Sequence, residues 1–252
     1  MESPKVKGPN TKLLECAGLI VRVISKDPST ENLAFEVFPT NEEGIISNLE
    51  PIFKATETTP STNNALEKCF TSPENRQFNL VVLNNDKDNK ELDETPFMEI
   101  AKTKDNKESV FQVSAKEKAE EEPIGTIECN MKSFRIQFKI NGSDTTYHID
   151  EKKHNKFSFE CLLCCGRGSG FYGDELSIYE SEKSSESKLD DPSKKLSGQA
   201  FLEPVGKITK LKRPVGYVKL QDTLISFPKG SYNEERSLLL ALTFLMAARF
   251  FK

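Results

Sequence analysis

The chain has 252 residues, of which 36% are hydrophobic and 29% charged, and its formal net charge is -4. These values exclude collagen-like, mucin-like and wholly disordered proteins, and the length suits one or two domains. Because the charge balance is slightly acidic and only two histidines are present, nucleic acid is not an expected partner.

The N-terminal residues 1–12 read MESPKVKGPNTK and lack the apolar core of a secretory signal. We expect them to form a disordered tail, and we expect the protein to stay in the reducing cytosol or nucleus. The six cysteines of the chain are then predicted to be free thiols, metal ligands or acylation sites rather than disulfides.

Short apolar segments separated by turn signals predict strands along most of the chain. The clearest is 134–140, in which apolar and polar residues alternate strictly, as in a strand with one exposed face. Many short strands at this spacing are typical of a barrel or a sandwich. In chain order the predicted strands are 19–24, 33–38, 78–83, 109–113, 134–140, 145–149, 157–164, 175–179, 205–208, 216–220 and 224–227.

Two stretches, at about 86–107 and 181–197, are predicted to be flexible insertions. The first is rich in Asp, Lys, Glu and Asn around a short apolar island at 97–100, and the second is dominated by Ser, Lys and acidic residues. Such sequences are too polar to join a core.

The only long apolar run, at 238–251, predicts a C-terminal helix. Its 14 residues would extend about 21 Å, which is short of the roughly 30 Å core of a bilayer. Arg249 interrupts the run, and the charged residues 234–236 precede it. A helix that is apolar on every side must be surrounded on every side, so we favour a central helix enclosed by a closed barrel over a membrane anchor or a surface-packed helix. Truncation after Arg236 should then unfold the domain.

Four segments in this order resemble the phospholipid scramblase family, whose domain is related to the tubby C-terminal domain. They are the Cys-rich segment 159–166, the V-G-K-I-T-K segment 205–210, the I-S-F-P segment 225–228 and the Leu/Ala/Phe-rich helix that follows. The resemblance implies that residues 13–252 form one closed antiparallel barrel of 12 strands around the C-terminal helix. It also implies a protein that binds phospholipids or translocates them between leaflets at the cytoplasmic face of the plasma membrane.

The clustered cysteines Cys161, Cys164 and Cys165 have several interpretations. With His148 or His154 they could bind Zn²⁺, but a second pair of ligands is missing from the sequence. Ordinary buried or loop cysteines are the simplest interpretation. The resemblance adds lipidation, since family members can be thioacylated with palmitate on a Cys run elsewhere in the chain.

The resemblance also implies a Ca²⁺ site just before Ile225. Calcium requires about six to eight oxygen ligands, several of them carboxylates. Asp222 is the only carboxylate in the segment 219–224, and Lys219 adds an opposing charge. Asp222 is therefore the metal candidate of this loop, and its surroundings argue against strong binding. No other cofactor is expected.

The densest basic cluster comprises Lys207, Lys210, Lys212 and Arg213. The simplest interpretation is that these side chains cover the solvated faces of strands. The functional interpretation is attraction to anionic lipid headgroups. The resemblance further implies a nuclear import signal around 206–210, which would place the protein in the nucleus as well.

The sequence contains no catalytic constellation: it has no Gly-x-Ser-x-Gly motif and no phosphate-binding glycine loop. We therefore expect a protein that is not an enzyme. The leading hypothesis is a scramblase-like protein whose partners are anionic phospholipids. The alternative is a soluble tubby-like binding module for phosphoinositides or a protein partner, without transport activity.

Overall fold

The structure, a computed structural model, describes eleven segments of the chain. They are residues 11–28, 32–59, 78–85, 96–103, 109–117, 120–130, 135–141, 146–151, 175–181, 204–211 and 222–250.

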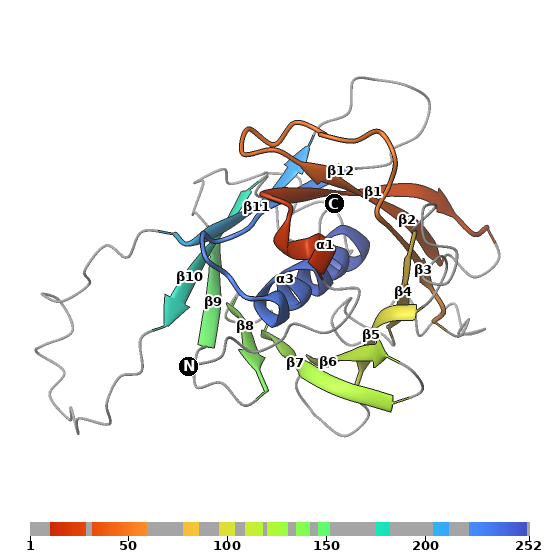
Figure 1. Cartoon of the computed structure of the whole chain (residues 1–252). Helices are drawn as coiled ribbons and strands as arrows, with labels where there is room; N and C mark the ends of the chain where they lie inside the picture. Colours follow the sequence, from red (N-terminus) through yellow and green to blue (C-terminus); the bar gives the residue numbers. More distant parts are fainter. Residues whose placement is uncertain are drawn as a thin grey trace, which may run out of the picture.

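Antiparallel strands make up most of the described residues (Figure 1). Each strand from β2 to β12 is hydrogen-bonded to its neighbours in the sequence, and β1 is hydrogen-bonded to both β2 and β12. The pairing thus returns to its first strand, and we call this arrangement the barrel. The strands are β1 Gly18–Lys26, β2 Leu33–Thr40, β3 Phe53–Glu57, β4 Asn79–Asn84, β5 Pro96–Lys102, β6 Ser109–Glu117, β7 Glu120–Asn130, β8 Arg135–Ile140, β9 Thr146–Glu151, β10 Glu175–Ser181, β11 Gly206–Leu211 and β12 Asp222–Ser226.

Alternation of side chains along each strand separates the interior of the barrel from its surface. In β1, Leu19, Val21 and Val23 face the interior and are at most 5% exposed, while Arg22 and Ile24 face outward. Residues that lie directly opposite each other on antiparallel strands share a face. The register therefore continues the inner apolar layer from β1 into β2 and β12.

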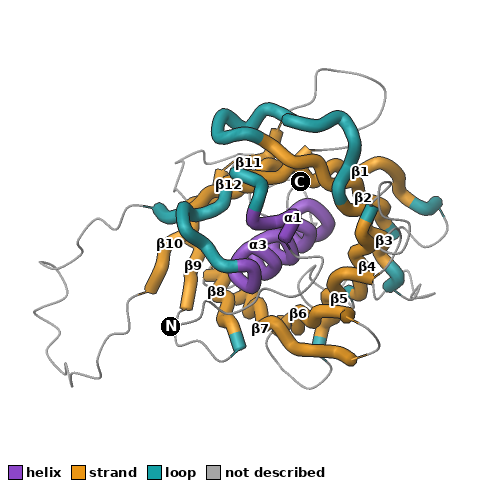
Figure 2. Tube along the Cα trace, in the orientation of Figure 1, coloured by secondary structure: helices purple, strands orange, loops and turns teal. Residues whose placement is uncertain are grey.

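Helix α3 (Asn233–Leu245) runs through the middle of the barrel (Figure 2). Every residue from Leu238 to Met246 is at most 1% exposed, and the helix contacts β7, β8 and β12. The short helix α1 (Thr11–Leu14) packs against it, and one turn of π-helix, η4 (Met246–Phe250), continues it. The prediction of a mainly β protein with one C-terminal helix is confirmed.

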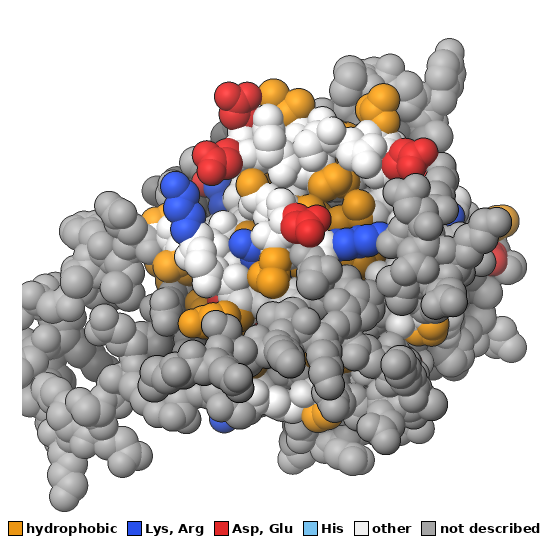
Figure 3. Space-filling view, in the orientation of Figure 1, with side chains coloured by type: hydrophobic (Ala, Val, Ile, Leu, Met, Phe, Trp, Pro, Cys, Tyr) orange, Lys and Arg blue, Asp and Glu red, His pale blue; other side chains and the backbone are white. Residues whose placement is uncertain are grey.

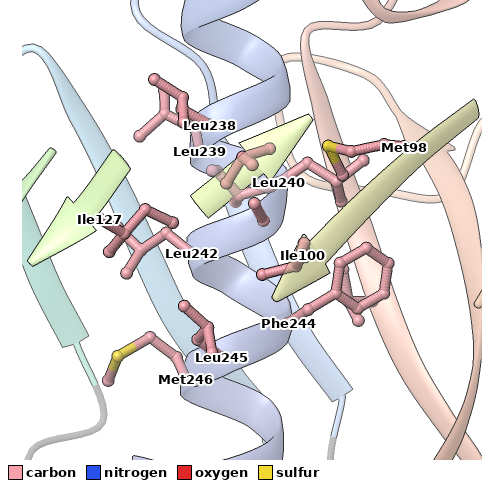
Figure 4. Close-up of a cluster of buried hydrophobic side chains, with 14 of the residues drawn as sticks. Met98, Ile100, Ile127, Leu238, Leu239, Leu240, Leu242, Phe244, Leu245 and Met246 are labelled. Carbon is pink, nitrogen blue, oxygen red and sulfur yellow. The ribbon is translucent and has the colours of Figure 1, made fainter. Parts of the chain in front are cut away.

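The side chains of α3 fill the interior. Figure 4 shows Leu240 and Phe244 pointing toward Met98 and Ile100 of β5, and the Phe244 ring meets the Phe35 ring edge to face at 5.3 Å between centroids. Burial on all sides excludes an ordinary surface-packed helix. Among the described residues, none of the helices combines the length and the apolar character needed to cross a bilayer.

Helix α3 begins earlier than the apolar run that predicted it. The run starts at Leu238, whereas the helix starts with a polar turn at Asn233. The Tyr232 backbone N–H donates to Glu235 Oε2 over 2.8 Å, which caps the N-terminus of the helix. The Tyr147 hydroxyl of β9 donates to Glu235 Oε1 over 2.5 Å. Glu235 therefore ties the start of the helix to the barrel wall.

Gly125 of β7 allows α3 to approach the sheet closely. A Cβ at this position would lie 2.8 Å from Leu238 Cδ1 and 2.3 Å from the Lys139 carbonyl oxygen. Such distances are far below ordinary van der Waals contact, so a side chain larger than hydrogen would push the helix and β8 apart.

Two sequence predictions need correction. The segment 86–107 was expected to stay out of the core, but its residues Pro96–Lys102 form β5 and bury Phe97, Met98 and Ile100. Pairing with β4 and β6 satisfies the backbone of β5, so a short apolar island is enough to form a strand. Thr11 and Lys12, assigned to the disordered tail, begin α1.

Two further strands of the structure were missing from the main set of predicted strands, and several predicted segments consist of residues that the structure does not describe. The strand β3 was not predicted, and the resemblance indicated β7 only as a weaker strand at Pro123–Gly125, because the apolar residues of both strands are few and interspersed with charged ones. The predicted strands 157–164 and 216–220 and residues 1–10 lie outside the described residues, as does the predicted insertion 181–197 except for Ser181, which ends β10.

Candidate functional site

The described members of the basic cluster lie on β11, but on opposite faces of it. Ile208, fully buried, faces the interior, and alternation puts Lys210 on that same face and Lys207 on the outer face. The register agrees, since Lys210 lies opposite Thr223, which is fully buried. The structure therefore does not bring Lys207 and Lys210 together on one surface.

Lys207 is the described basic residue of this cluster that faces outward. Its side chain is 46% exposed, and its Nζ lies 2.6 Å from Glu175 Oε2 of β10. The neighbouring carboxylate neutralises part of the positive potential at this point. Lys212 and Arg213 lie outside the described residues.

Asp222, the candidate calcium ligand, is bound by an arginine. Its Oδ2 accepts a hydrogen bond from Arg22 Nη2 over 3.0 Å, and both carboxylate oxygens lie 3.3 Å from Arg22 Nε. The Arg22 guanidinium also lies over the Phe38 ring, 4.9 Å from its centroid. Such fork-like pairing uses the lone pairs that a cation would need.

No group of three His, Cys, Asp or Glu side chains able to hold a metal ion occurs among the described residues. Calcium requires several carboxylate oxygens around one point, and the described surroundings give Asp222 a cationic neighbour instead. The geometry thus assigns Asp222 to an ion pair that joins β12 to β1 on the outer surface of the barrel.

The cysteine cluster is not described: Cys161, Cys164, Cys165 and His154 lie outside the described residues. His148 belongs to β9, where its backbone lies opposite Tyr179 of β10. The lipidation and zinc hypotheses for this cluster stay predictions.

The two cysteines that the structure does describe, Cys16 and Cys129, are buried and are not joined in a disulfide. Burial raises the pKa of Cys16 to about 11, although the positive charge of Arg236 works against that shift. A thiol with a raised pKa is a poor nucleophile and a poor metal ligand near neutral pH. Cys16 is therefore a structural side chain.

Sequence analysis did not identify the cluster of polar contacts around Arg236, which lies at the end of the barrel where α3 begins. Arg236 donates from Nη1 to the carbonyl oxygens of Leu13 (2.5 Å) and Cys16 (2.8 Å), and from Nε to Ser231 Oγ (2.9 Å). Its guanidinium also lies 4.9 Å from the centroid of the Phe227 ring. Burial lowers the pKa of Arg236, and the nearby Cys16 and Glu235 counteract that shift.

Arg236 thus connects α1, the start of β1, the β12–α3 loop and α3 itself. The sequence offered one signal, a charged residue immediately before a fully apolar helix. That signal was interpreted only as an obstacle to membrane insertion.

Comparison with known proteins found no matching family model, curated protein or solved structure. The resemblance to scramblases therefore rests on the residues of this chain alone.

Proposed function

We propose that this chain is a phospholipid-binding module of the scramblase and tubby type, which acts from the cytoplasmic face of a membrane and binds lipid on its outer surface without catalysing a reaction. The observation that carries the proposal is the filled interior, in which α3 is fully buried from Leu238 to Met246. The pairing of β1 with both β2 and β12 around this helix supports the closed, 12-stranded tubby-like barrel implied by the resemblance.

The interior favours surface binding over passage of lipid through the barrel. A phospholipid headgroup carries charges, and moving an unpaired charge into an apolar interior costs at least several kcal/mol. The helix and the inward residues of the strands present almost entirely apolar side chains to each other. A headgroup would have to displace α3, which is the core of the domain.

The outer surface near β11 is the proposed lipid-binding region. Lys207 faces outward there, and Lys212 and Arg213 directly follow the last residue of β11 in the sequence. A basic residue near an anionic leaflet contributes about 1 kcal/mol of attraction, which salt screens. Lys210 is excluded from this region because it shares the inner face with Ile208.

Sedimentation with vesicles tests the proposal. The wild-type protein is compared with the triple variant Lys207→Glu, Lys212→Glu, Arg213→Glu on vesicles with and without phosphatidylserine, at low and physiological salt. The matched control is Lys139→Glu, because Lys139 is an exposed, outward-facing lysine on β8. We expect salt-sensitive binding to anionic vesicles that the triple variant loses and the control keeps. Unchanged binding in the triple variant would overturn the proposed region.

Reconstitution with a fluorescent lipid, with Ca²⁺ or with a chelator, separates binding from transport. We expect no leaflet exchange in either condition, and exchange that depends on the protein would overturn the surface-binding proposal. Vesicles that contain a phosphoinositide in place of phosphatidylserine test the tubby-like alternative. A protein that binds no vesicle of any composition contradicts a lipid ligand altogether.

A further inference from the structure

Residues 41–50, in the loop between β2 and β3, carry two of the three most exposed large apolar side chains among the described residues. Leu49 is 88% exposed and Ile45 is 59% exposed. Such side chains usually avoid water when a nearby core can accept them, so their exposure in one short loop suggests a surface that another molecule covers.

This loop is held in a defined shape by hydrogen bonds to the Asn41 side chain and to the backbone of β2. The Asn41 side-chain oxygen accepts hydrogen bonds from the N–H groups of Glu43 (3.0 Å) and Ile45 (2.9 Å), and the Ser47 N–H donates to the Pro39 carbonyl over 2.9 Å. Gly44, at φ +76°, packs so tightly that a Cβ there would lie 2.9 Å from Leu224 Cδ2 of β12.

The loop therefore leaves β2 and lies across the outer face of β1 to reach β12, as the chain path in Figure 1 shows. Its exposed side chains are presented on a preorganised support, so binding would cost little loop-ordering entropy.

The charge of this loop is uniformly negative. Its sequence, NEEGIISNLE, contains Glu42, Glu43 and Glu50 and no basic residue, and all three glutamates are exposed. Figure 3 shows acidic and hydrophobic side chains close together along the upper edge of this face, where the loop runs in Figure 1.

The loop lies at the end of the barrel where α3 begins, because Gly18, at the start of β1, pairs with both Thr40 at the end of β2 and Ser226 at the end of β12. The cytoplasmic leaflet of a membrane is itself negative and would repel the three glutamates.

We infer that the loop 41–50 is a docking site for a basic amphipathic helix of another protein. The apolar face of that helix covers Ile45 and Leu49, and its lysines or arginines pair with Glu42, Glu43 and Glu50. Charge complementarity selects this partner over a lipid surface, and over a second copy of this acidic chain. The residues of this site differ from those of the proposed lipid-binding region on β11, so separate variants test the two proposals and either can fail while the other holds.

Fluorescence anisotropy with a labelled synthetic peptide tests the inference on the full chain. The probe is a helical peptide of lysine and leucine with its leucines at i, i+3 and i+4 spacing. It is compared with a scrambled peptide of the same composition and with one that has glutamate in place of lysine. The protein variants are the pair Ile45→Ser, Leu49→Ser and the triple change of Glu42, Glu43 and Glu50 to Gln. The matched control is Ile24→Ser, because Ile24 is an exposed apolar residue at the far end of β1.

We expect the amphipathic basic peptide to bind most tightly and each loop variant to weaken binding about tenfold or more, with Ile24→Ser unchanged. Since the altered side chains are exposed, thermal unfolding should match the wild type. Equal binding of the scrambled peptide, or no loss in the loop variants, would overturn the inference. Loss of vesicle binding or of self-association in the Ile45→Ser, Leu49→Ser variant would assign the surface to lipid or to a second copy, and would overturn it as well.

Discussion

Replacing Arg236 by methionine tests whether one guanidinium holds the end of the barrel closed. Methionine keeps a long apolar stem but removes the charge and every N–H donor of the side chain. The change deprives the carbonyl oxygens of Leu13 and Cys16 of a charged donor, and it also removes the contacts with Ser231 and Phe227. The Leu13 carbonyl belongs to the last turn of α1, whose carbonyl groups have no partner within the helix.

The magnitude follows from these contacts. A hydrogen bond to a charged group contributes about 1.5 to 3 kcal/mol. The three bonds of Arg236 share one partly exposed charge, so their contributions do not add fully. We expect Arg236→Met to lower the unfolding free energy by about 3 kcal/mol, and the melting temperature by roughly 6 to 12 °C for a domain of this size. Arg236→Lys keeps the charge but cannot reach three acceptors in a fork, so it should recover only part of the loss.

Chemical denaturation measures the global effect, and hydrogen exchange at residues 11–17 measures the local one. Exchange there should become faster than in the wild type, because α1 loses its connection to α3. The reasoning is refuted if Arg236→Met stays within about 0.5 kcal/mol of the wild type and exchange at these residues is unchanged.

Three further predictions address the core, the Arg22–Asp222 ion pair and pH. Leu242→Ala should lower the unfolding free energy by about 2 to 5 kcal/mol, since Leu242 is fully buried, and truncation after Arg236 should abolish folding by circular dichroism. In a double-mutant cycle of Arg22→Met and Asp222→Asn, each single change should destabilise the protein by about 1 to 3 kcal/mol and the pair by less than the sum, while added Ca²⁺ leaves the melting temperature unchanged. The raised pKa of Cys16 keeps the folded thiol protonated, so stability should be complete below pH 9.0 and decline toward pH about 11. A pH titration of the melting temperature in which Cys16→Ala declines as steeply as the wild type would contradict this reasoning.

Local pattern predicted the strands whose apolar residues alternate without interruption. The segment 134–140 is one example, and β8 buries its Ile136, Phe138 and Ile140. It also predicted the C-terminal helix, because a run that is apolar on all sides suits a fully enclosed helix better than a surface helix. Strand periodicity also indicated that the basic cluster does not lie on one face, because residues three apart on a strand, such as Lys207 and Lys210, face opposite sides.

The sequence by itself thus determined that this protein is mainly β with one apolar helix at its C-terminal end. The side-chain periods that distinguish the two, two residues in a strand and 3.6 in a helix, are local properties of the chain. Only the tertiary structure decided which residues meet. Arg236 reaches the carbonyl oxygen of Leu13, 223 positions away in the sequence, and Arg22 reaches Asp222, 200 positions away. β5 forms because β4 and β6 pair with it on either side. Contacts of this kind depend on strand register and on the path of the chain around the barrel, which no local pattern encodes.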